Sequence, residues 1–588
     1  MGVRHRLTTS EYGRLSAAPI GAQATFELYG RQRWAADAGK RMLHENDVND
    51  LVRRTMRVSL PLSVTVLGDG RVAVVEGHGV AERVVVRAPD RDDLHNVLGG
   101  GVRRILGDAG GRLLAEIGGG SAPAAVVALP SLARVTDLAD GEMPCVVGSQ
   151  LCVIGPVGIR FPSAEPEKKP WEASGLGEIV PQLVRAVGTA AVAWVSEDSA
   201  GFHLRIVSWH ESEPEITTIT LDARPQDLAV SPAGRRIALV LRGRVILVED
   251  GRVVDVPDAR AEPGICWLDE ERLCWISRQW PDSALVTHSF DDGSRTSEVF
   301  AGWTLGRLYR SGDAAAAIAT RHRRPPTAIE TARLSRADLS HPEFGSVEVS
   351  GGSLRTITFP PDRPPTGLVI MLRGGPYGEW LPGWDPIVET IEESGWVAVQ
   401  LESPYTAAVL GRLPVFRRGQ FGTRDAALVA EAASALTYRF GLNTSQTAFV
   451  GHSYGAFLAA RATAHLGAPV AGLVTMNGPW TTGDLLAMGA DPATGNSLLS
   501  RFLRQAFPAD TQPPAPEQEA RDLPKHWRVI YGTADTTASA AVTERAVNRD
   551  RPSAVLRLDG EPHIPRRRES IAETMRFLDT WLRGVGSS

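Results

Sequence analysis

The sequence has little of several features that define whole classes of protein. Its four cysteines in 588 residues are too few for a disulfide scaffold and lack the paired spacing of a zinc site. We therefore expect reduced core cysteines, with a local disulfide as the alternative. No apolar run reaches the roughly 18 residues that span a bilayer, and no apolar segment follows the basic N-terminus. These absences predict a cytoplasmic chain with no membrane partner and no bound metal.

An excess of charge of one sign is also absent. The formal net charge is −5 at pH 7, and both signs are scattered along the chain. No basic stripe could therefore follow a phosphate backbone, and we expect no nucleic-acid partner. With 43% hydrophobic and 22% charged residues, the composition is that of an ordinary soluble globular protein, and the length predicts at least two domains.

The first half of the chain has the pattern of an all-β structure. Short apolar stretches alternate with Gly, Asp and Pro turns from about residue 55 to 335. A turn followed by an apolar strand recurs seven times, about every 40 residues, and the residues that precede these strands are Arg71, Arg112, Gln150, Ala190, Arg236, Arg272 and Ala314. A four-stranded propeller blade has about this length. The repeat predicts a seven-bladed β-propeller, and a β-sandwich or a pair of barrels is the alternative.

The second half of the chain alternates strands with helices. Short apolar runs typical of buried parallel strands lie at residues 367–372, 396–401, 447–451, 472–477, 528–532 and 554–558. Segments with helical spacing lie between and after them, at 425–438, 454–465, 538–548 and 566–582. This alternation predicts a doubly wound, mostly parallel sheet with helices on both faces. In such sheets the chemistry lies at the carboxyl ends of the strands.

These patterns divide the chain into three parts. Residues 1–55 form an N-terminal segment, partly helical from about residue 22, which we expect to pack on the catalytic domain. Residues 56–335 form the predicted propeller, and residues 336–588 form the predicted α/β domain.

A candidate nucleophile follows directly after one of the predicted strands. Residues 451–455 have the sequence Gly-His-Ser-Tyr-Gly and stand between an apolar strand and a helical segment, which is the setting in which GxSxG is meaningful. The two glycines permit a turn that is too tight for side chains, so the hydroxyl of Ser453 is exposed. We predict that Ser453 is the nucleophile of a strand-turn-helix elbow.

A serine hydroxyl becomes a good nucleophile only when a base takes its proton. Two histidines follow Ser453 in the sequence, His526 and His563. His526 precedes a predicted strand and is expected in a surface loop. His563 lies in the loop after the strand at 554–558, at the edge of the sheet where active sites lie. The predicted base is therefore His563.

The base in turn needs a carboxylate that orients it. Asp535 follows the strand at 528–532 and is the predicted acid, with Asp559, four residues before His563, as the alternative. A third histidine, His452, is adjacent to the nucleophile in sequence. We expect its side chain to point away from the site and to have a packing role.

The oxyanion of a tetrahedral intermediate needs two hydrogen-bond donors. One predicted donor is the N–H of Tyr454, directly after the nucleophile. The second is expected from the Gly-rich loop after the strand at 367–372, within Arg373, Gly374 and Gly375. No metal is required for this chemistry.

At this point the chain resembles the prolyl oligopeptidase family of serine peptidases, in its acylaminoacyl-peptidase and dipeptidyl-peptidase-like branch. The resemblance covers nearly the whole length: propeller repeats, then GHSYGAF at the elbow, RGGPYG at the oxyanion loop, GTAD for the acid and PHIP for the base. It implies an α/β-hydrolase domain capped by a propeller that admits short peptides, and no cofactor. The chain departs from the family at Arg373, where relatives commonly carry His or Tyr. Arg373 either donates to the oxyanion or pairs with a substrate carboxylate.

These features predict a serine peptidase that hydrolyses short peptides through an acyl-enzyme on Ser453, with the propeller restricting access. Trp480 and Tyr377 are candidate walls of the substrate pocket. An esterase, amidase or peptide cyclase on the same scaffold is the alternative, because these reactions use the same triad. A binding propeller with an inactive hydrolase domain is a third, weaker alternative. The sequence leaves open whether the chain forms a homo-oligomer.

Overall fold

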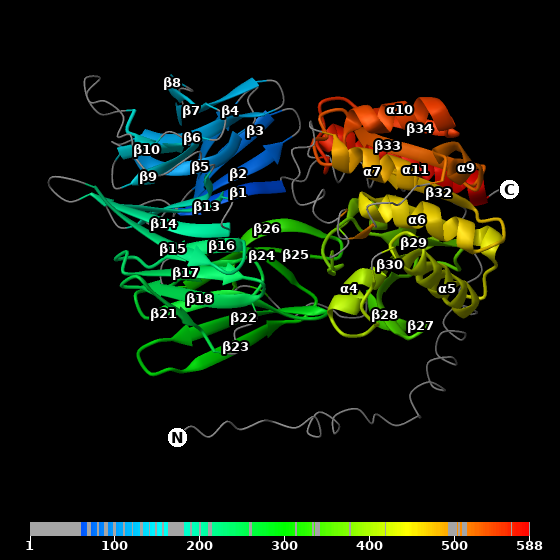
Figure 1. Cartoon of the computed structure of the whole chain (residues 1–588), viewed down its shortest axis with the longest axis horizontal. Helices are drawn as coiled ribbons and strands as arrows, with labels where there is room; N and C mark the ends of the chain where they lie inside the picture. Colours follow the sequence, from blue (N-terminus) through cyan, green and yellow to red (C-terminus); the bar gives the residue numbers. More distant parts are fainter. Residues whose placement is uncertain are drawn as a thin grey trace.

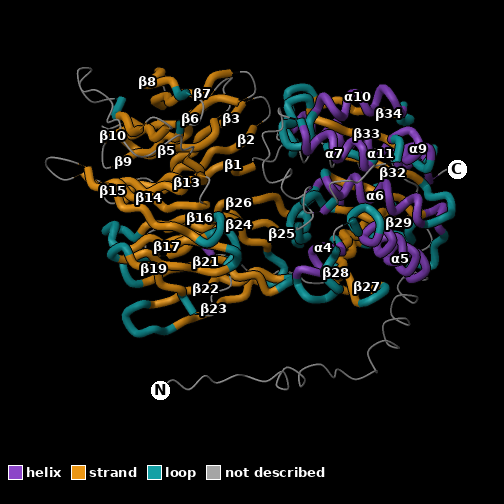
Figure 2. The backbone as a smooth tube through the Cα atoms, viewed as in Figure 1, coloured by secondary structure: helices purple, strands orange, loops and turns teal. Residues whose placement is uncertain are grey.

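The computed structural model describes the chain between residues 60 and 586, except for 163–180, 335–341, most of 492–513 and a number of shorter stretches in loops. The N-terminal segment 1–55, with its expected helix, lies outside the described residues. Two parts lie side by side (Figure 1). The seven-sheet part contains β1 to β26 and the mixed-sheet part contains β27 to α11, and Figure 2 shows that the described helices belong to the second.

The seven-sheet part consists of small antiparallel sheets, each built from strands that are consecutive in the chain. The first four are β1 (Leu60–Val66), β2 (Val72–His78), β3 (Ala81–Arg87), β4 (Asp92–Val97); β5 (Val102–Ala109), β6 (Arg112–Gly119), β7 (Ala122–Leu129), β8 (Ala133–Asp137); β9 (Met143–Val147), β10 (Gln150–Gly155), β11 (Gly158–Arg160); and β12 (Pro181–Val187), β13 (Ala191–Asp198), β14 (Gly201–Trp209), β15 (Pro214–Leu221). The other three are β16 (Pro225–Val230), β17 (Arg236–Leu241), β18 (Arg244–Glu249), β19 (Arg252–Asp255); β20 (Ile265–Trp267), β21 (Arg272–Gln279), β22 (Asp282–Ser289), β23 (Arg295–Phe300); and β24 (Thr304–Ser311), β25 (Ala314–Arg321), β26 (Arg324–Glu330).

The sequence repeat marks the same strand in every sheet. Each of the seven aligned residues begins or directly precedes the second strand of its sheet, from Arg71 before β2 to Ala314 at the start of β25. The first strands of successive sheets pack on one another, and β24 of the last sheet contacts β1 of the first. The seven sheets therefore follow one another around a closed circuit.

Alternation of side chains along each strand supplies two neighbouring cores. In β17, Leu239 faces a core shared with β13 and β14, whereas Ala238 and Val240 face a core shared with β20 and β21. Successive side chains of a strand point to opposite faces, so one apolar strand can pack against the sheet before it and the sheet after it. This explains why the strands of this part are apolar on both faces.

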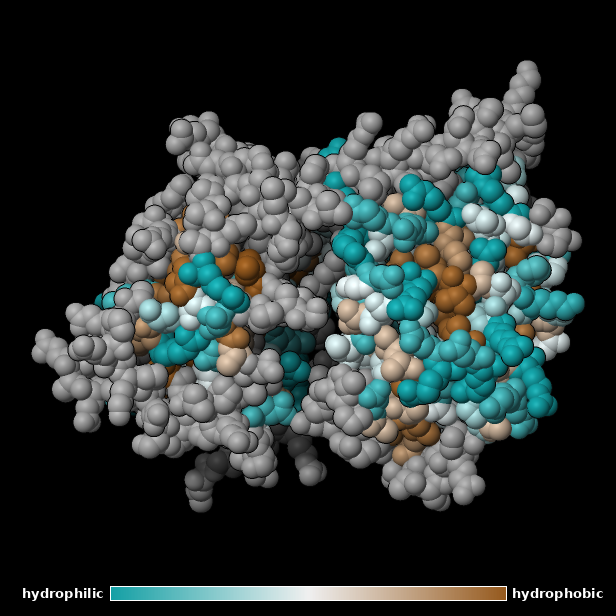
Figure 3. Space-filling model, turned by 90° about the horizontal axis from the view of Figure 1, so that it is seen from above, coloured by the Kyte–Doolittle hydropathy of each residue, from teal (hydrophilic) through white to brown (hydrophobic). Residues whose placement is uncertain are grey.

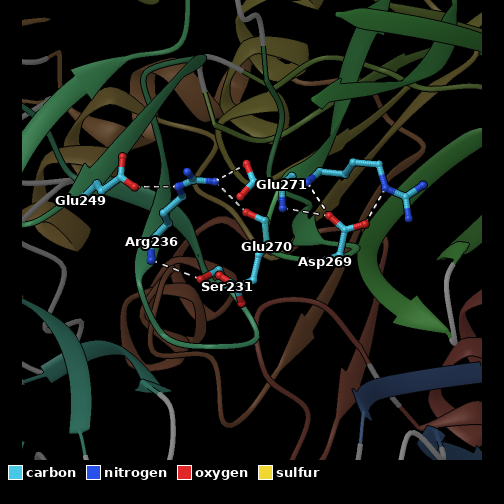
Figure 4. A network of polar contacts seen from close by, with 7 residues as sticks. Ser231, Arg236, Glu249, Asp269, Glu270 and Glu271 are labelled. Atoms are coloured by element: carbon cyan, nitrogen blue, oxygen red, sulfur yellow. Dashed lines mark hydrogen bonds and ion pairs between the residues drawn. The ribbon is translucent and has the colours of Figure 1, made fainter. Parts of the chain in front are cut away.

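Polar contacts also link neighbouring sheets at their outer turns (Figure 4). Arg236, at the start of β17, donates to a Glu249 carboxylate oxygen at 2.9 Å, to the Glu270 carbonyl at 2.7 Å and to a Glu271 carboxylate oxygen at 2.9 Å. Asp269 accepts the N–H groups of Glu271 and Arg272, which shapes the turn before β21. One guanidinium thus ties the fifth sheet to the turn between β20 and β21 of the sixth.

The mixed-sheet part is built on one eight-stranded sheet. Its strand order is β27-β28-β30-β29-β31-β32-β33-β34; β28 pairs antiparallel with β27 and β30, and the remaining pairs are parallel. The strands are β27 (Glu343–Val349), β28 (Gly352–Phe359), β29 (Gly367–Leu372), β30 (Trp396–Leu401), β31 (Thr447–His452), β32 (Gly472–Met476), β33 (Trp527–Gly532) and β34 (Ala554–Leu558). The six predicted strands are confirmed. The antiparallel pair β27 and β28 was not predicted, because polar residues interrupt its apolar pattern.

Helices cover both faces of this sheet, as predicted. They are α3 (Pro386–Glu393), α4 (Pro404–Val409), α5 (Arg424–Arg439), α6 (Tyr454–His465), α7 (Thr482–Ala490), α9 (Pro516–Arg521), α10 (Ala540–Asp550) and α11 (Arg568–Gly586), with a short 3-10 turn at Thr444–Gln446. Alternate residues of β29 sort to the two faces: Ile370 packs in the core under α5 and α6, and Val369 in the core under α3 and α11. The fully apolar strands follow from this double coverage.

The two parts meet through a few side chains. Thr320 of β25 accepts the N–H of Trp384 at 3.0 Å. Trp280, in the turn after β21, lies 5.9 Å from the ring of Phe344 and 4.5 Å from the guanidinium carbon of Arg355. Seen from above, the space-filling view shows a narrow hollow between the two parts (Figure 3).

The four cysteines are buried and free, so the prediction of reduced core residues is confirmed. They face each other in two pairs across neighbouring strands, Cys145 with Cys152 and Cys266 with Cys274. In the part of the chain that the structure describes, no helix is both long and apolar enough to cross a membrane. The same residues contain no group of three or more His, Cys, Asp or Glu side chains that could hold a metal ion.

The core under α11 provides a test of this packing. Trp581 is 1% exposed and its indole N–H donates to the His526 carbonyl at 3.0 Å. We expect Trp581→Ala to lower the free energy of unfolding of the mixed-sheet part by about 3–5 kcal/mol, because it leaves a cavity and an unpaired carbonyl. Tyr438→Ala is the matched control, since that ring is 87% exposed. Denaturant unfolding followed by circular dichroism measures both, and equal midpoints for the two variants would contradict the packing.

Candidate active site

Ser453 lies in a sharp turn between β31 and α6. Its backbone has φ 55° and ψ −125°, a region that residues with side chains rarely adopt. A Cβ on Gly451 would lie 2.2 Å from the Gly455 carbonyl, and one on Gly455 would lie 2.2 Å from the Leu372 carbonyl. Glycine is therefore required at both positions. The strand-turn-helix geometry predicted for the GxSxG segment is present.

His563 and Asp535 form a hydrogen-bonded pair. The Nδ1 atom of His563 lies 2.8 Å from Oδ2 of Asp535. Asp535 is 5% exposed, and its other oxygen accepts the N–H groups of Thr537 at 2.8 Å and Ala538 at 2.9 Å. These bonds hold the carboxylate in one orientation, and a carboxylate on Nδ1 keeps the proton there and leaves Nε2 as the basic nitrogen.

The alternatives to this pair lie elsewhere. Asp559 is 82% exposed at its side chain and pairs with Arg557 at 3.0 Å. His526 is exposed directly before β33, as expected for a surface loop residue. The structure therefore brings Asp535, and not Asp559, to His563.

The loop that carries His563 is tied to the residues around Ser453. The carbonyl of His563 accepts from Nε2 of His452 at 3.0 Å and from Nδ2 of Asn477 at 2.7 Å. The N–H of Ser453 donates to the carbonyl of Met476, directly before Asn477, at 2.9 Å. Among the described residues, no hydrogen bond joins Ser453 Oγ to the His563 ring. Bonds of this kind are often long in free enzymes and shorten when substrate binds.

The position of His452 corrects a prediction. Its side chain was expected to point away from the site, yet its ring centroid lies 4.8 Å from that of His563. Burial, and to a lesser extent the neighbouring His563, lowers the pKa of His452 to about 4. The neutral ring then carries the proton that it donates to the His563 carbonyl. His452 therefore lies beside His563 and holds its loop through this hydrogen bond, instead of packing away from the site.

Asn477 is a functional residue that sequence reasoning missed. Its side-chain oxygen accepts the N–H of Gly532 at 2.7 Å while its amide donates to His563, so it links the end of β33 to the His563 loop. It is 1% exposed and has φ 45°, which asparagine tolerates better than most residues. The available signal was a polar residue at the end of an otherwise apolar strand.

A buried pair also anchors the helix that begins after Ser453. The hydroxyl of Tyr454 donates to Asp425 of α5 at 2.6 Å. Burial raises the pKa of Asp425 to about 6, although the bond from Tyr454 opposes this shift. Tyr454 is the first residue of α6, and N–H groups in a first helical turn have no acceptor within the helix. The pair holds this donor end of α6 beside Ser453, and Asp425 was not predicted.

The Gly-rich loop after β29 lies against Ser453, where it was expected. A Cβ on Gly374 would lie 2.6 Å from the Ser453 Cβ, and Gly375 has φ 98°. The guanidinium of Arg373 donates to the carbonyl of Glu379 in the same loop. Arg373 is exposed as a whole residue, yet partial desolvation of its guanidinium, followed by the nearby cation of Arg278, lowers its pKa.

The two residues predicted to line the substrate pocket are not confirmed there. Trp480 is 1% exposed, packs 4.9 Å from Trp527 in the core and donates to Asp550 at 2.8 Å. Its assignment to the pocket wall is therefore wrong. The sequence could not separate the two positions, because an apolar residue just after a buried strand also suits the core. Tyr377 lies outside the described residues.

The contact between His452 and His563 predicts a pH dependence. The pKa of His452 falls from 6.5 to about 4 on folding, so the unfolded chain takes up a proton first as the pH falls. The neutral buried ring therefore makes its full contribution to the free energy of unfolding above about pH 6.5. This contribution is lost progressively as the pH falls towards 4. The variant His452→Gln keeps a hydrogen-bond donor and cannot titrate. We expect its melting temperature to fall less than that of the wild type when the pH is lowered from about 7.5 to 5. Exposed His526→Gln is the control, and parallel losses in wild type and His452→Gln would refute this effect.

No protein-family model matches the sequence, and no curated protein gives a significant match. Solved structures do match the fold. A puromycin hydrolase is 15% identical with a TM-score of 0.67, over 94% of this chain and 96% of that chain. A puromycin-hydrolyzing peptidase of Mycobacterium tuberculosis is 14% identical with a TM-score of 0.66, over 93% and 96%. An acylaminoacyl peptidase of Pyrococcus horikoshii is 10% identical with a TM-score of 0.68, over 90% and 96%.

These neighbours are propeller-plus-hydrolase peptidases of the prolyl oligopeptidase family. The match extends over nearly all of each chain, so it includes both the seven-sheet part and the mixed-sheet part. The resemblance inferred from the four motifs is thus confirmed at the level of the fold, and the chain has the fold of prolyl oligopeptidase family members.

Proposed function

We propose that the protein is a serine peptidase that cleaves short peptides through an acyl-enzyme on Ser453. The observation that carries the proposal is the His563–Asp535 pair, in which the His563 carbonyl accepts from His452 of the elbow and from Asn477 at the end of β32. Nucleophile, acid and base follow three parallel strands of one sheet, β31, β33 and β34, which is the arrangement expected for acyl transfer. The names of the structural neighbours, all hydrolases or peptidases, support an amide substrate.

Each step then has an assigned group. Ser453 Oγ attacks the scissile carbonyl while Nε2 of His563 takes its proton, and Asp535 stabilises the imidazolium that forms. The imidazolium gives the proton to the leaving amine, and the acyl group stays on Ser453. Water, deprotonated by the same nitrogen, then releases the acid and restores the serine.

The developing oxyanion lies between two donor segments. The N–H of Tyr454 at the start of α6 is one donor, and the N–H groups of the Gly374–Gly375 turn provide the other. Gly374 packs on the Ser453 side chain, so this turn is close enough to serve. The bond from Tyr454 to Asp425 keeps the first donor in place before substrate arrives.

The seven sheets supply access control in this proposal. Their closed circuit, their sequence repeat and the structural neighbours support a seven-bladed propeller over residues 56–335. The catalytic domain then spans 336–588, with 1–55 as an added N-terminal segment. A propeller beside the elbow would admit flexible peptides and exclude folded proteins.

The first test uses a mixed peptide library incubated with the wild type and with Ser453→Ala, followed by mass spectrometry of the products. We expect cleavage by the wild type alone, because the variant keeps the fold and loses the nucleophile. Cleavage by both proteins would assign the chemistry to another residue. Cleavage by neither would move the assignment to ester or acyl-transfer substrates.

The second test separates the two candidate acids. Asp535→Asn should lower kcat by about 10⁴-fold, because an amide at this position favours the wrong tautomer of His563. Asp559→Asn is the matched control and should change kcat less than about twofold, since its exposed ion pair is of little value. Steady-state hydrolysis of a peptide found in the first test measures both. Comparable losses in the two variants would overturn the assignment of Asp535.

A further inference from the structure

The end of β21, in the seven-sheet part, carries an arginine near the loop beside Ser453. Trp280, after β21, packs on Phe344 and lies against the guanidinium of Arg355. Arg278, two residues earlier, is close enough to Arg373 for the two cations to repel each other. Arg355 lies 3.6 Å from the carboxylate of Glu379, whose carbonyl accepts from Arg373, and Gly374 lies against Ser453. Direct contacts therefore link the turn at Trp280, beside Arg278 in the sequence, to the edge of the candidate active site.

Arg278 is unusual because most of its hydrogen-bonding capacity is unused. Its Nε and one terminal nitrogen, NH1, are buried and have no hydrogen-bond partner in the described part of the chain. The nearest carboxylate is that of Glu262, 3.7 Å from the other terminal nitrogen. Buried guanidinium groups are normally paired, because an unpaired buried charge is unfavourable. An arginine with unpaired buried donors is suited to bind an acceptor group on a ligand.

The carboxylates near Arg278 and Arg373 already interact with other groups. Glu379 lies 3.6 Å from Arg355, and its carbonyl holds Arg373. Asp385 is partly buried and accepts the N–H of Ile387 at the start of α3. The pKa of Arg373 is lowered despite these carboxylates, first by burial and then by Arg278. Each of these two carboxylates is therefore already engaged by another group.

Glu262 approaches only one of the three guanidinium nitrogens of Arg278. Burial raises the pKa of Glu262, Arg278 opposes this shift, and the neighbouring Glu379 adds to it. A small cavity at the same interface includes Glu379 in its lining, together with Trp280, Arg355, Trp380 and Glu402. The interface thus combines the unused donors of Arg278 with a small unfilled space nearby.

We propose that Arg278, together with Arg373, binds a carboxylate of the peptide substrate next to Ser453. The planar fork of a guanidinium matches a carboxylate through two parallel N–H bonds, which a lysine cannot reproduce. This inference rests on the proposed peptidase function. The carboxylate is either the free C-terminus of a short peptide or the side chain of an Asp or Glu near the cleaved bond. In either case a residue of the seven-sheet part selects substrates for the catalytic domain.

The test measures binding to Ser453→Ala, so that it does not depend on cleavage. A mixed peptide library made as free acids and the same library made as C-terminal amides are bound separately and quantified by mass spectrometry. We expect the acid form to be retained at least about tenfold more tightly, the usual effect of one charge-assisted pair. Adding Arg278→Gln should bring this ratio close to one, and Arg278→Lys should restore it only in part.

The control is Arg355→Gln in the same background. Arg355 contacts Trp280 at the same interface, so its removal perturbs the contact between the two parts without removing the proposed ligand. We expect the acid preference to survive in this variant. Enrichment of Asp- and Glu-containing peptides in both libraries, abolished by Arg278→Gln, would assign the site to an acidic side chain instead of the C-terminus.

Two results would overturn the inference. Equal retention of acids and amides with no enrichment of acidic residues would show that no carboxylate is recognised. An acid preference that persists in Arg278→Gln would place recognition elsewhere. Neither result bears on peptide cleavage by the wild type, which tests the proposed function separately.

Discussion

The site depends on the tight turn at Ser453, which holds a residue with a side chain in a backbone conformation that normally excludes one. Glycines make this possible by letting other segments approach closely. A Cβ on Gly478 would lie 2.2 Å from the Ser453 carbonyl, as close as those on Gly451 and Gly455 would lie to their own neighbours. The strain, of the order of 1–3 kcal/mol, is tolerated because the surrounding sheet and helices fix the turn from all sides. Its result is a serine hydroxyl at the carboxyl edge of the sheet.

The other predicted catalytic groups are placed by the same sheet. β33 and β34 run parallel to β31, so the loops after them reach the edge at which Ser453 stands. Asn477 and His452 then tie the His563 backbone to the elbow, and buried backbone N–H groups orient Asp535. The chemistry is therefore assembled by hydrogen bonds to the backbone as much as by side chains that meet substrate. Supporting bonds of this kind set the precision of an active site.

Local signals in the sequence were enough to predict much of this arrangement. The apolar runs predicted six strands of the sheet, and GxSxG between a strand and a helix predicted the elbow. Asp535 and His563 were predicted because each follows a predicted strand, and the structure brings the two side chains together. The seven-fold repeat marked the second strand of every small sheet, because turn residues and apolar alternation recur in each unit.

What the sequence could not supply depends on contacts between distant segments. The orientation of His452 follows from a carbonyl more than a hundred positions away, and the core position of Trp480 follows from Trp527 and Asp550. Asp425 is an unremarkable helical residue until the fold sets it against Tyr454. Arg278 lies in a different domain from the elbow, and only the folded chain shows that its donors are unused. No pattern of residue types along the chain encodes these distances.

The central claim is that Ser453 is an activated nucleophile, and covalent labelling tests it most directly. The folded wild type would be treated with a fluorophosphonate probe and digested, and the modified residue would be identified by mass spectrometry. The structure predicts a single adduct on Ser453, with labelling strongly slowed in His563→Ala because the base that activates the serine is gone. A folded protein that takes up no probe, or takes it up on another residue, would contradict the account.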